Sequence, residues 1–168
     1  MQLTLTVKLQ PNPAQAQSLL ATMERFNAAC NTIAEAAFRE HTASQVKLHH
    51  LMYREVRDTF DLSAPMAVRA IGKFVAVYKR DKSIQPIFRP HGAIVYDDRL
   101  LSWKGLERVS ILTWDGRRSR FTRLSGVAST VGRSINCGSL SSTRRRWRAF
   151  PSSWSIRAIP RGRVLNAD

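Results

Sequence analysis

Alternation of apolar and polar residues at the N-terminus predicts a β-strand. Between residues 2 and 9, leucine and valine alternate with threonine and lysine, the period-two pattern of a strand with one buried face. Pro11 and Pro13 follow, and proline cannot donate a hydrogen bond to a sheet. We therefore expect a strand over residues 2–9 that ends before these prolines.

From Pro13 onward the apolar residues recur at intervals of three and four, which is typical of amphipathic helices. Three such stretches follow one another, over residues 13–40, 45–60 and 64–80. Thr42 or Ser44 can cap the second helix, and Ser63 followed by Pro65 starts the third. The pattern predicts a compact three-helix lobe.

After residue 80 the pattern changes to short strands, all within residues 86–115. The expected pieces are an extended segment at Pro86–Arg89, strands at Ala93–Tyr96 and Leu100–Trp103 around a hairpin turn at Asp97–Arg99, and a strand at Arg108–Trp114 closed by Asp115-Gly116. Turn residues of this kind separate strands. The expected fold class is therefore α+β: a three-helix lobe inserted after the first strand of a small antiparallel sheet or barrel.

Charge divides the chain of 168 residues, which carries a net charge of +15, into two parts. Residues 1–117 hold 16 Lys and Arg against 11 Asp and Glu, whereas residues 118–168 hold 11 Arg, no Lys and a single acid, Asp168. The second part also contains ten serines and shows no sustained periodicity. We therefore expect a folded unit over 1–117, followed by an irregular, disordered or non-native Arg/Ser-rich tail over 118–168.

Composition excludes several classes of protein. No stretch approaches the roughly 18 apolar residues of a membrane span, and the alternating N-terminus lacks the apolar run of a signal peptide. Two cysteines, Cys30 and Cys137, are too few for a disulfide scaffold or a four-cysteine zinc site. The strong positive charge indicates a polyanionic partner. We expect a cytoplasmic protein that binds nucleic acid and no membrane.

Basic residues cluster on the second and third predicted helices and just beyond them. The candidate phosphate-binding residues are Arg54, Arg57, Arg69, Lys73, Lys79, Arg80, Lys82 and Arg89. Lys and Arg neutralise phosphates, and Arg also makes bidentate contacts. The alternative is a solvated helix face with local ion pairs. Tyr53, Phe88 and Trp103 could stack on bases, or belong to the core or its rim.

Catalytic motifs are missing from the sequence. Asp97-Asp98 and Asp115-Gly116 are typical of turns, and Cys30 lies on the apolar stripe of the first helix, which favours a buried hydrophobic role over that of a nucleophile. The histidines lack the i, i+4 spacing of a helical zinc site, and no glycine-rich phosphate loop is present. From its residues alone, the chain is expected to bind an anion, and the sequence identifies no reaction that it would catalyse.

Seven short motifs in order across residues 1–117 give a family resemblance. They lie at Lys8–Pro13 with Gln15, Phe26–Asn31, Tyr53–Arg57, Ala67–Lys73 leading to Tyr78-Lys79, Pro86–Arg89, Ile94–Asp97 and Val109–Arg117. In this order the sequence resembles the N-terminal part of the OrfB (TnpB-type) proteins of bacterial and archaeal insertion sequences.

The resemblance implies a wedge-type barrel interrupted by a helical recognition lobe. It also implies a transposase-type, RNA-guided DNA endonuclease, whose partners are a guide RNA and a target DNA. A protein of this kind contacts the nucleic-acid backbone and recognises its shape, while base pairing between guide and target reads the sequence. Family members continue into a RuvC-type nuclease domain with Mg²⁺-binding carboxylates and a zinc ribbon. Residues 118–168 cannot supply these, so neither Mg²⁺ nor Zn²⁺ nor another cofactor is expected in this chain.

Two interpretations of residues 118–168 follow. In one, Ser141–Arg148 is an arginine-rich segment that folds on RNA. In the other, a frameshift near Arg117 has replaced the family sequence, which explains the composition break and the missing periodicity with one event and which we favour. The expected function is that of a truncated transposase fragment that binds nucleic acid but does not cut it. The alternatives are a stand-alone basic RNA-binding regulatory module and an inert pseudogene product.

Overall fold

The structure is a computed structural model that describes residues 6–104, 108–123, 146–150 and 155–159. Its helices are α1 (Pro13–Arg39), α2 (Gln45–Phe60) and α3 (Ala64–Tyr78). Its strands are β1 (Thr6–Gln10), β2 (Ile94–Tyr96), β3 (Leu101–Lys104), β4 (Arg108–Leu112), β5 (Arg118–Arg123), β6 (Arg146–Phe150) and β7 (Ser155–Ile159). All three helices lie between β1 and β2 in the sequence, which confirms the predicted α+β fold.

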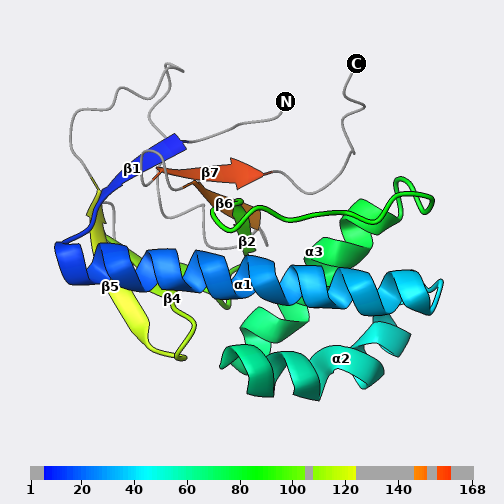
Figure 1. The fold of residues 1–168 in the computed structure, drawn as a ribbon. Helices are drawn as coiled ribbons and strands as arrows, with labels where there is room; N and C mark the ends of the chain where they lie inside the picture. Colours follow the sequence, from blue (N-terminus) through cyan, green and yellow to red (C-terminus); the bar gives the residue numbers. More distant parts are fainter. Residues whose placement is uncertain (1–5, 105–107, 124–145, 151–154, 160–168) are drawn as a thin grey trace.

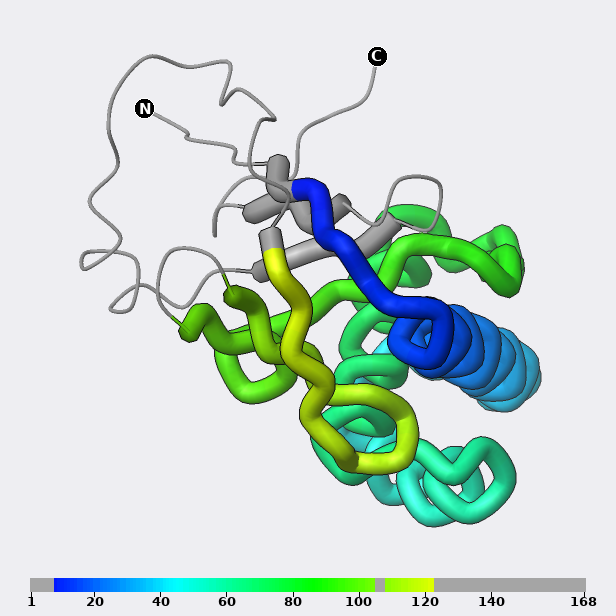
Figure 2. Tube along the Cα trace, turned by 90° about the vertical axis from the view of Figure 1, so that its left-hand side faces the viewer, coloured from blue at the N-terminus to red at the C-terminus, as the bar shows by residue number. Residues whose placement is uncertain are grey.

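The described strands form one antiparallel sheet in the order β2-β6-β7-β1-β5-β4-β3. Strand β1 lies in the middle and has two partners, because Thr6 to Lys8 pair with β7 whereas Leu9 and Gln10 pair with β5. Figure 2 shows β1 in blue beside β5 in yellow. The first strand of the chain therefore joins the strands that follow the helices.

Each helix begins at a residue that suits a helix N-terminus. Asn12 caps α1 through a reciprocal capping box, in which its side chain accepts from the Gln15 backbone N–H and its own N–H donates to the Gln15 side chain. Ser44, one of the two predicted caps, accepts from the Lys47 backbone at the start of α2. Ser63 precedes α3, whose early Pro65 needs no N–H partner there.

The helices pack against one another and share one core with the sheet. Figure 1 shows α1 running along the molecule, with β4 and β5 at one end and with α2 and α3 towards the other. Buried side chains from helices and strands, among them Phe26, Ile71, Phe74, Tyr96 and Phe121, belong to the same core cluster. In the described ranges, no helix has the length and apolar character needed to cross a membrane.

One predicted hairpin is wrong. The turn at Asp97 exists, but β2 and β3 on either side of it do not pair, because β2 pairs with β6 and β3 pairs with β4. The hairpins of this region are instead β3–β4 and β4–β5. The second of them turns at Asp115-Gly116 as predicted, with Gly116 at a φ of +77° that favours glycine.

The sheet also extends into the segment that was expected to be an irregular tail. Residues 118–123 form β5, where Phe121 is buried against the core and its neighbour Arg120 is exposed. Residues 146–150 and 155–159 form β6 and β7, which pair with each other and with β2 and β1. Strands of only five or six residues escape detection by periodicity, because pairing with distant strands decides their structure. The origin of residues 118–168 by a frameshift stays a prediction.

Candidate nucleic-acid interface

Lys73, a predicted phosphate-binding residue on α3, is half-buried and held by protein groups. Its Nζ donates to Asn27 Oδ1 at 2.6 Å and to the carbonyl oxygen of Ala93 at 2.9 Å. The same nitrogen lies 4.8 Å from the ring centre of Phe88, within the range of a cation–π interaction. Lys73 therefore joins α1 and α3 to the segment that leads into β2, which we call the connector, residues 79–93.

Two asparagines of α1 fix the connector in place. Asn31 Nδ2 donates to the carbonyl oxygen of Phe88 at 3.0 Å, and the Phe88 N–H donates to Asn31 Oδ1 at 2.7 Å. Asn27 Nδ2 donates to the carbonyl oxygens of Pro90 and Gly92 at 3.0 and 2.9 Å. Because Asn27 and Asn31 are four residues apart, they project from the same face of α1. The connector is therefore held by side chains, although it has no strand partner in the described residues.

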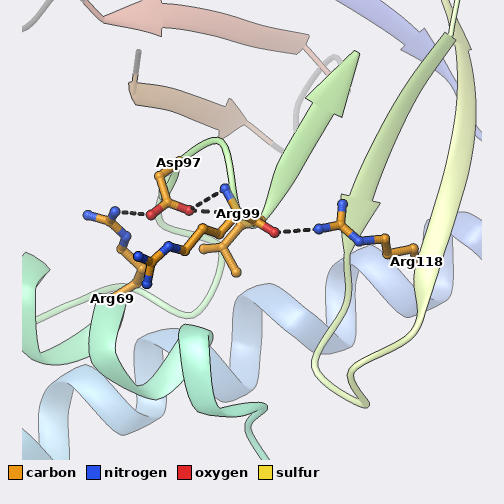
Figure 3. Close-up of polar contacts among 5 residues, drawn as sticks. Arg69, Asp97, Arg99 and Arg118 are labelled. Atoms are coloured by element: carbon orange, nitrogen blue, oxygen red, sulfur yellow. Dashed lines mark hydrogen bonds and ion pairs between the residues drawn. The ribbon is translucent and has the colours of Figure 1, made fainter. Parts of the chain in front are cut away.

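Arg69, a second predicted contact residue, forms an ion pair with Asp97 in the turn after β2 (Figure 3). The other carboxylate oxygen of Asp97 accepts from the backbone N–H groups of Arg99 and Leu100, both at 3.1 Å. The Asp97 side chain is only 10% exposed and that of Arg69 is 28% exposed. The predicted turn role of Asp97 is confirmed, and Arg69 holds α3 to that turn.

The six remaining candidates are exposed. Two lie on α2 and four lie at the end of α3 or on the connector: Arg54 and Arg57, then Lys79, Arg80, Lys82 and Arg89. We call the last four the connector cations. Within the described ranges none of the six forms an ion pair. Asp81, the acid among the connector cations, accepts instead from the Ser83 hydroxyl and N–H at 2.5 and 2.9 Å, and these hydrogen bonds lower the pKa of Asp81.

The exposed candidates do not form one patch. Arg57 lies beside the start of α3, whereas Lys79 follows its last residue. A helix of 15 residues is about 22 Å long, so the two arginines of α2 and the connector cations require separate contacts. A nucleic acid that touched both would have to extend along α3.

An open hollow of about 770 Å³ lies where α2, α3 and the β4–β5 turn meet. Its charged lining residues are Arg57, Asp58, Asp61 and Asp115. Arg25 pairs with Asp61 and Arg117 pairs with Asp115, so the hollow has no excess of positive charge that would attract phosphate. The hollow is therefore a poor site for a nucleic-acid backbone. If Arg57 binds phosphate, it does so outside the hollow, on the exposed surface of α2.

The aromatic candidates for base stacking are all half-buried. The Tyr53 ring is stacked on His49 at a centroid distance of 4.6 Å, and the Arg57 guanidinium lies 5.7 Å from its centre. Phe88 lies beneath Lys73, and Trp103 packs against the core. The alternative role of these rings, in the core or at its rim, fits the described geometry better than base stacking.

Two arginines with specific contacts were not among the sequence candidates. Arg25, on α1, lies 3.8 Å from the ring centre of Trp114 and donates to Asp61 Oδ2 at 3.2 Å. Arg118, on β5, donates to the carbonyl oxygen of Arg99 (Figure 3). It also donates to Ser102 Oγ. No local sequence signal marks either residue, because their partners are distant in the chain.

Cys30, on α1, lies in the core of the protein. Cys30 is fully buried in α1, and burial raises the pKa of its thiol to about 12 although the charge of Lys73 opposes the shift. Its predicted role as a buried hydrophobic residue is confirmed. In the described part of the chain, no group of three or more His, Cys, Asp or Glu side chains could hold a metal ion.

Comparisons with known proteins do not assign a family to this chain. No family model matches it, and no curated protein matches it. The resemblance to the OrfB-type proteins therefore stays a prediction that rests on the seven ordered motifs. Three of these motifs have an observed structural task, because Asn27 and Asn31, Lys73, and Phe88 meet around the connector.

Proposed function

We propose that this chain is the nucleic-acid-binding lobe of an OrfB-type, transposon-encoded protein and that it holds a guide RNA and a target DNA without cutting them. The observation that carries the proposal is the connector. It places Lys79, Arg80, Lys82 and Arg89 in solvent within eleven residues, with Asp81 as the one acid among them. Since Asp81 is bonded to Ser83, the four cations are available to phosphates.

Attachment of the connector to α1 strengthens this argument. A segment already fixed by Asn27, Asn31 and Lys73 loses less conformational entropy on binding than a free loop would. The backbone of Phe88 is bonded to Asn31 of α1, its ring lies beside Lys73, and its neighbour Arg89 is exposed. The fold therefore favours presentation of Arg89 to a ligand in a defined position.

The absence of cutting is proposed from the sequence. Cleavage of a phosphodiester by two metal ions needs clustered carboxylates, and Asp168 is the single acid of residues 118–168. In the strand region, Asp97 accepts from its own turn and pairs with Arg69, and Asp115 accepts from Thr113 and Arg117. These acids serve local structure, so the proposed activity is binding.

Salt-dependent binding tests the proposal. Fluorescence anisotropy would follow a labelled RNA hairpin and a labelled DNA duplex between 50 and 200 mM salt, concentrations over which phosphate contacts have a large effect. Each phosphate contact contributes about 0.9 to the slope of log affinity against log salt. The variant Arg80→Gln/Arg89→Gln should therefore lower the slope by about 2.

A control and a contradicting outcome complete this experiment. The variant Arg39→Gln/Lys47→Gln removes the same charge at the α1–α2 junction and should leave the slope nearly unchanged. Equal effects of the two variants would show a general charge effect and contradict a connector site. Specific cleavage of the nucleic acid by the purified chain with Mg²⁺ would contradict the proposed lack of cutting.

A second candidate, a self-contained RNA-binding module, is favoured by one observation. Strands β6 and β7, from the segment ascribed to a frameshift, supply partners to β2 and β1. Integration into the sheet supports a selected role for that segment. If this role is RNA binding, replacing Arg144, Arg145 and Arg146 by glutamine should weaken RNA binding, and unchanged affinity would count against it.

A further inference from the structure

The outer face of strands β3, β4 and β5 carries cations in neighbouring positions. The register places Lys104 opposite Arg108, and it places Ser102, Ser110 and Arg120 side by side. Leu101, Val109, Ile111 and Phe121 are buried on the core face. On the outer face the β4 residues Ser110 and Leu112 are also buried, whereas the cations around them are exposed. Because side chains alternate along a strand, four exposed cations share the outer face. We call Lys104, Arg108, Arg118 and Arg120 the sheet cations.

The same face continues onto β1. Gln10 is the partner of Thr122, which lies two residues after Arg120 on β5. Lys8 precedes Gln10 by two residues and is exposed, so it shares the outer face with Gln10. A fifth cation therefore extends the row beyond β5.

These charges are not neutralised within the described part of the face. Like charges directly opposite on adjacent strands destabilise a sheet, and Lys104 and Arg108 form such a pair. No acidic residue of β1, β3, β4 or β5 lies there in the described ranges; Glu107 falls outside them. Arg118 is held by the neutral oxygens of Ser102 and Arg99, which orient its guanidinium without cancelling its charge. Such an arrangement is stabilised by a bound anion.

We propose that this face binds the phosphate backbone of a nucleic-acid duplex. Five cations on a sheet surface suit a row of phosphates. Stacking of unpaired bases requires aromatic side chains, and the described residues of this outer face include none, because Trp103 points to the core face with Val109. A duplex offers phosphates without unpaired bases and is therefore the better ligand.

This face is distinct from the connector. Gln15, in the first turn of α1, donates to the carbonyl oxygen of Arg120, whereas Asn31 binds Phe88 of the connector. Sixteen residues of helix separate Gln15 from Asn31, a distance of about 24 Å. One chain therefore presents two phosphate-binding faces, which contact two segments of nucleic acid at the same time. The inference rests on the proposed function, because both take nucleic acid as the ligand, but it involves different residues.

The variant Lys104→Gln/Arg108→Gln tests the sheet face. With a 16-base-pair duplex as the probe, the slope of log affinity against log salt should fall by about 2. The midpoint of urea unfolding should stay the same or rise, because a repulsive pair has been removed. If this variant does not fold, Arg120→Gln should lower the slope by about 1, since only the backbone of Arg120 contacts Gln15.

Three outcomes would overturn the inference. One is an unchanged slope in both sheet variants. Another is that the sheet variants lose as much affinity for a single strand of the same sequence as for the duplex, or more. The third is that the unmodified chain binds polyglutamate as tightly as it binds the duplex. If Arg80→Gln/Arg89→Gln lowers the slope while the sheet variants do not, the sheet face is excluded and the connector proposal stands. If the unmodified chain binds no nucleic acid, both are overturned.

Discussion

Asn31 binds both backbone polar groups of Phe88, as the backbone of a neighbouring strand would. The Phe88 N–H donates to Asn31 Oδ1 at 2.7 Å, and Asn31 Nδ2 donates to the Phe88 carbonyl oxygen at 3.0 Å. A side-chain amide offers an acceptor oxygen and a donor NH₂ group, so one asparagine satisfies a residue that has no strand partner among the described residues. Ile87, 86% exposed, and Arg89 flank Phe88 and remain in solvent.

Asn31→Ala should release the connector. Loss of two half-buried hydrogen bonds that leaves backbone groups unsatisfied should lower the free energy of unfolding by about 1–3 kcal/mol, measured by urea denaturation. Hydrogen exchange at the Phe88 amide should accelerate more than exchange in the core of α3. Thr32→Ala, which removes a longer hydrogen bond to Ala28 on the same helix, is the control and should have a smaller effect. Equal exchange at Phe88 in Asn31→Ala and the unmodified chain would show that other contacts hold the connector.

Arg69→Gln should separate a structural role from a binding role. The Arg69–Asp97 pair is largely buried, and removing one partner leaves the carboxylate uncompensated, which we expect to cost about 2 kcal/mol or more. Asp97→Asn keeps an acceptor for the turn, so it should be less destabilising. The salt slope of nucleic-acid binding should change less in Arg69→Gln than in Arg80→Gln. A normal unfolding midpoint together with a lower slope would instead assign Arg69 to phosphate contact.

Local patterns explain which parts of the fold were predictable. The helix predicted over 13–40 is observed over Pro13–Arg39, because apolar spacing and capping residues act within a few positions. The false hairpin at Asp97 arose because the partner of β2 is β6, some fifty residues away. Likewise, Arg69 and Lys73 appear free in the sequence, but Asp97 and Asn27, at 28 and 46 residues' separation, engage them. Strand pairing and the partners of these two cations depend on contacts between distant residues, which local sequence patterns do not reveal.

Cys30 should resist thiol reagents in the folded chain. Its thiol is fully buried with a pKa raised to about 12 by that burial, and only the thiolate reacts. In a Cys137→Ser background, labelling by iodoacetamide at pH 8 should be slow in buffer and fast in urea. Rapid labelling of the native chain would require α1 to open far more readily than its packing implies.

Acid should weaken the β4–β5 turn through Asp115. Burial alone would raise the pKa of Asp115, but hydrogen bonds from the Thr113 hydroxyl and the Arg117 N–H, with the charge of Arg117, lower it below its usual 3.8. A lowered native pKa stabilises the fold above the unfolded value, and this stabilisation is lost as the pH falls through the native value. The urea midpoint should therefore drop below pH 4, and Asp115→Asn should show a smaller drop. Parallel pH profiles for the two proteins would exclude this contribution.

Tyr96→Phe should stabilise the protein. The Tyr96 side chain on β2 is 1% exposed, and its hydroxyl finds no hydrogen-bond partner among the described residues; its burial raises the pKa of that hydroxyl. A buried, unsatisfied hydroxyl costs about 1–3 kcal/mol, and phenylalanine keeps the ring in the core without that cost. The urea midpoint should rise at an unchanged m-value, which reports the surface exposed on unfolding. Tyr78→Phe, at a buried tyrosine stacked on Phe74, is the matched control and should give no gain. A lower midpoint in Tyr96→Phe would show that the hydroxyl has a partner in solution.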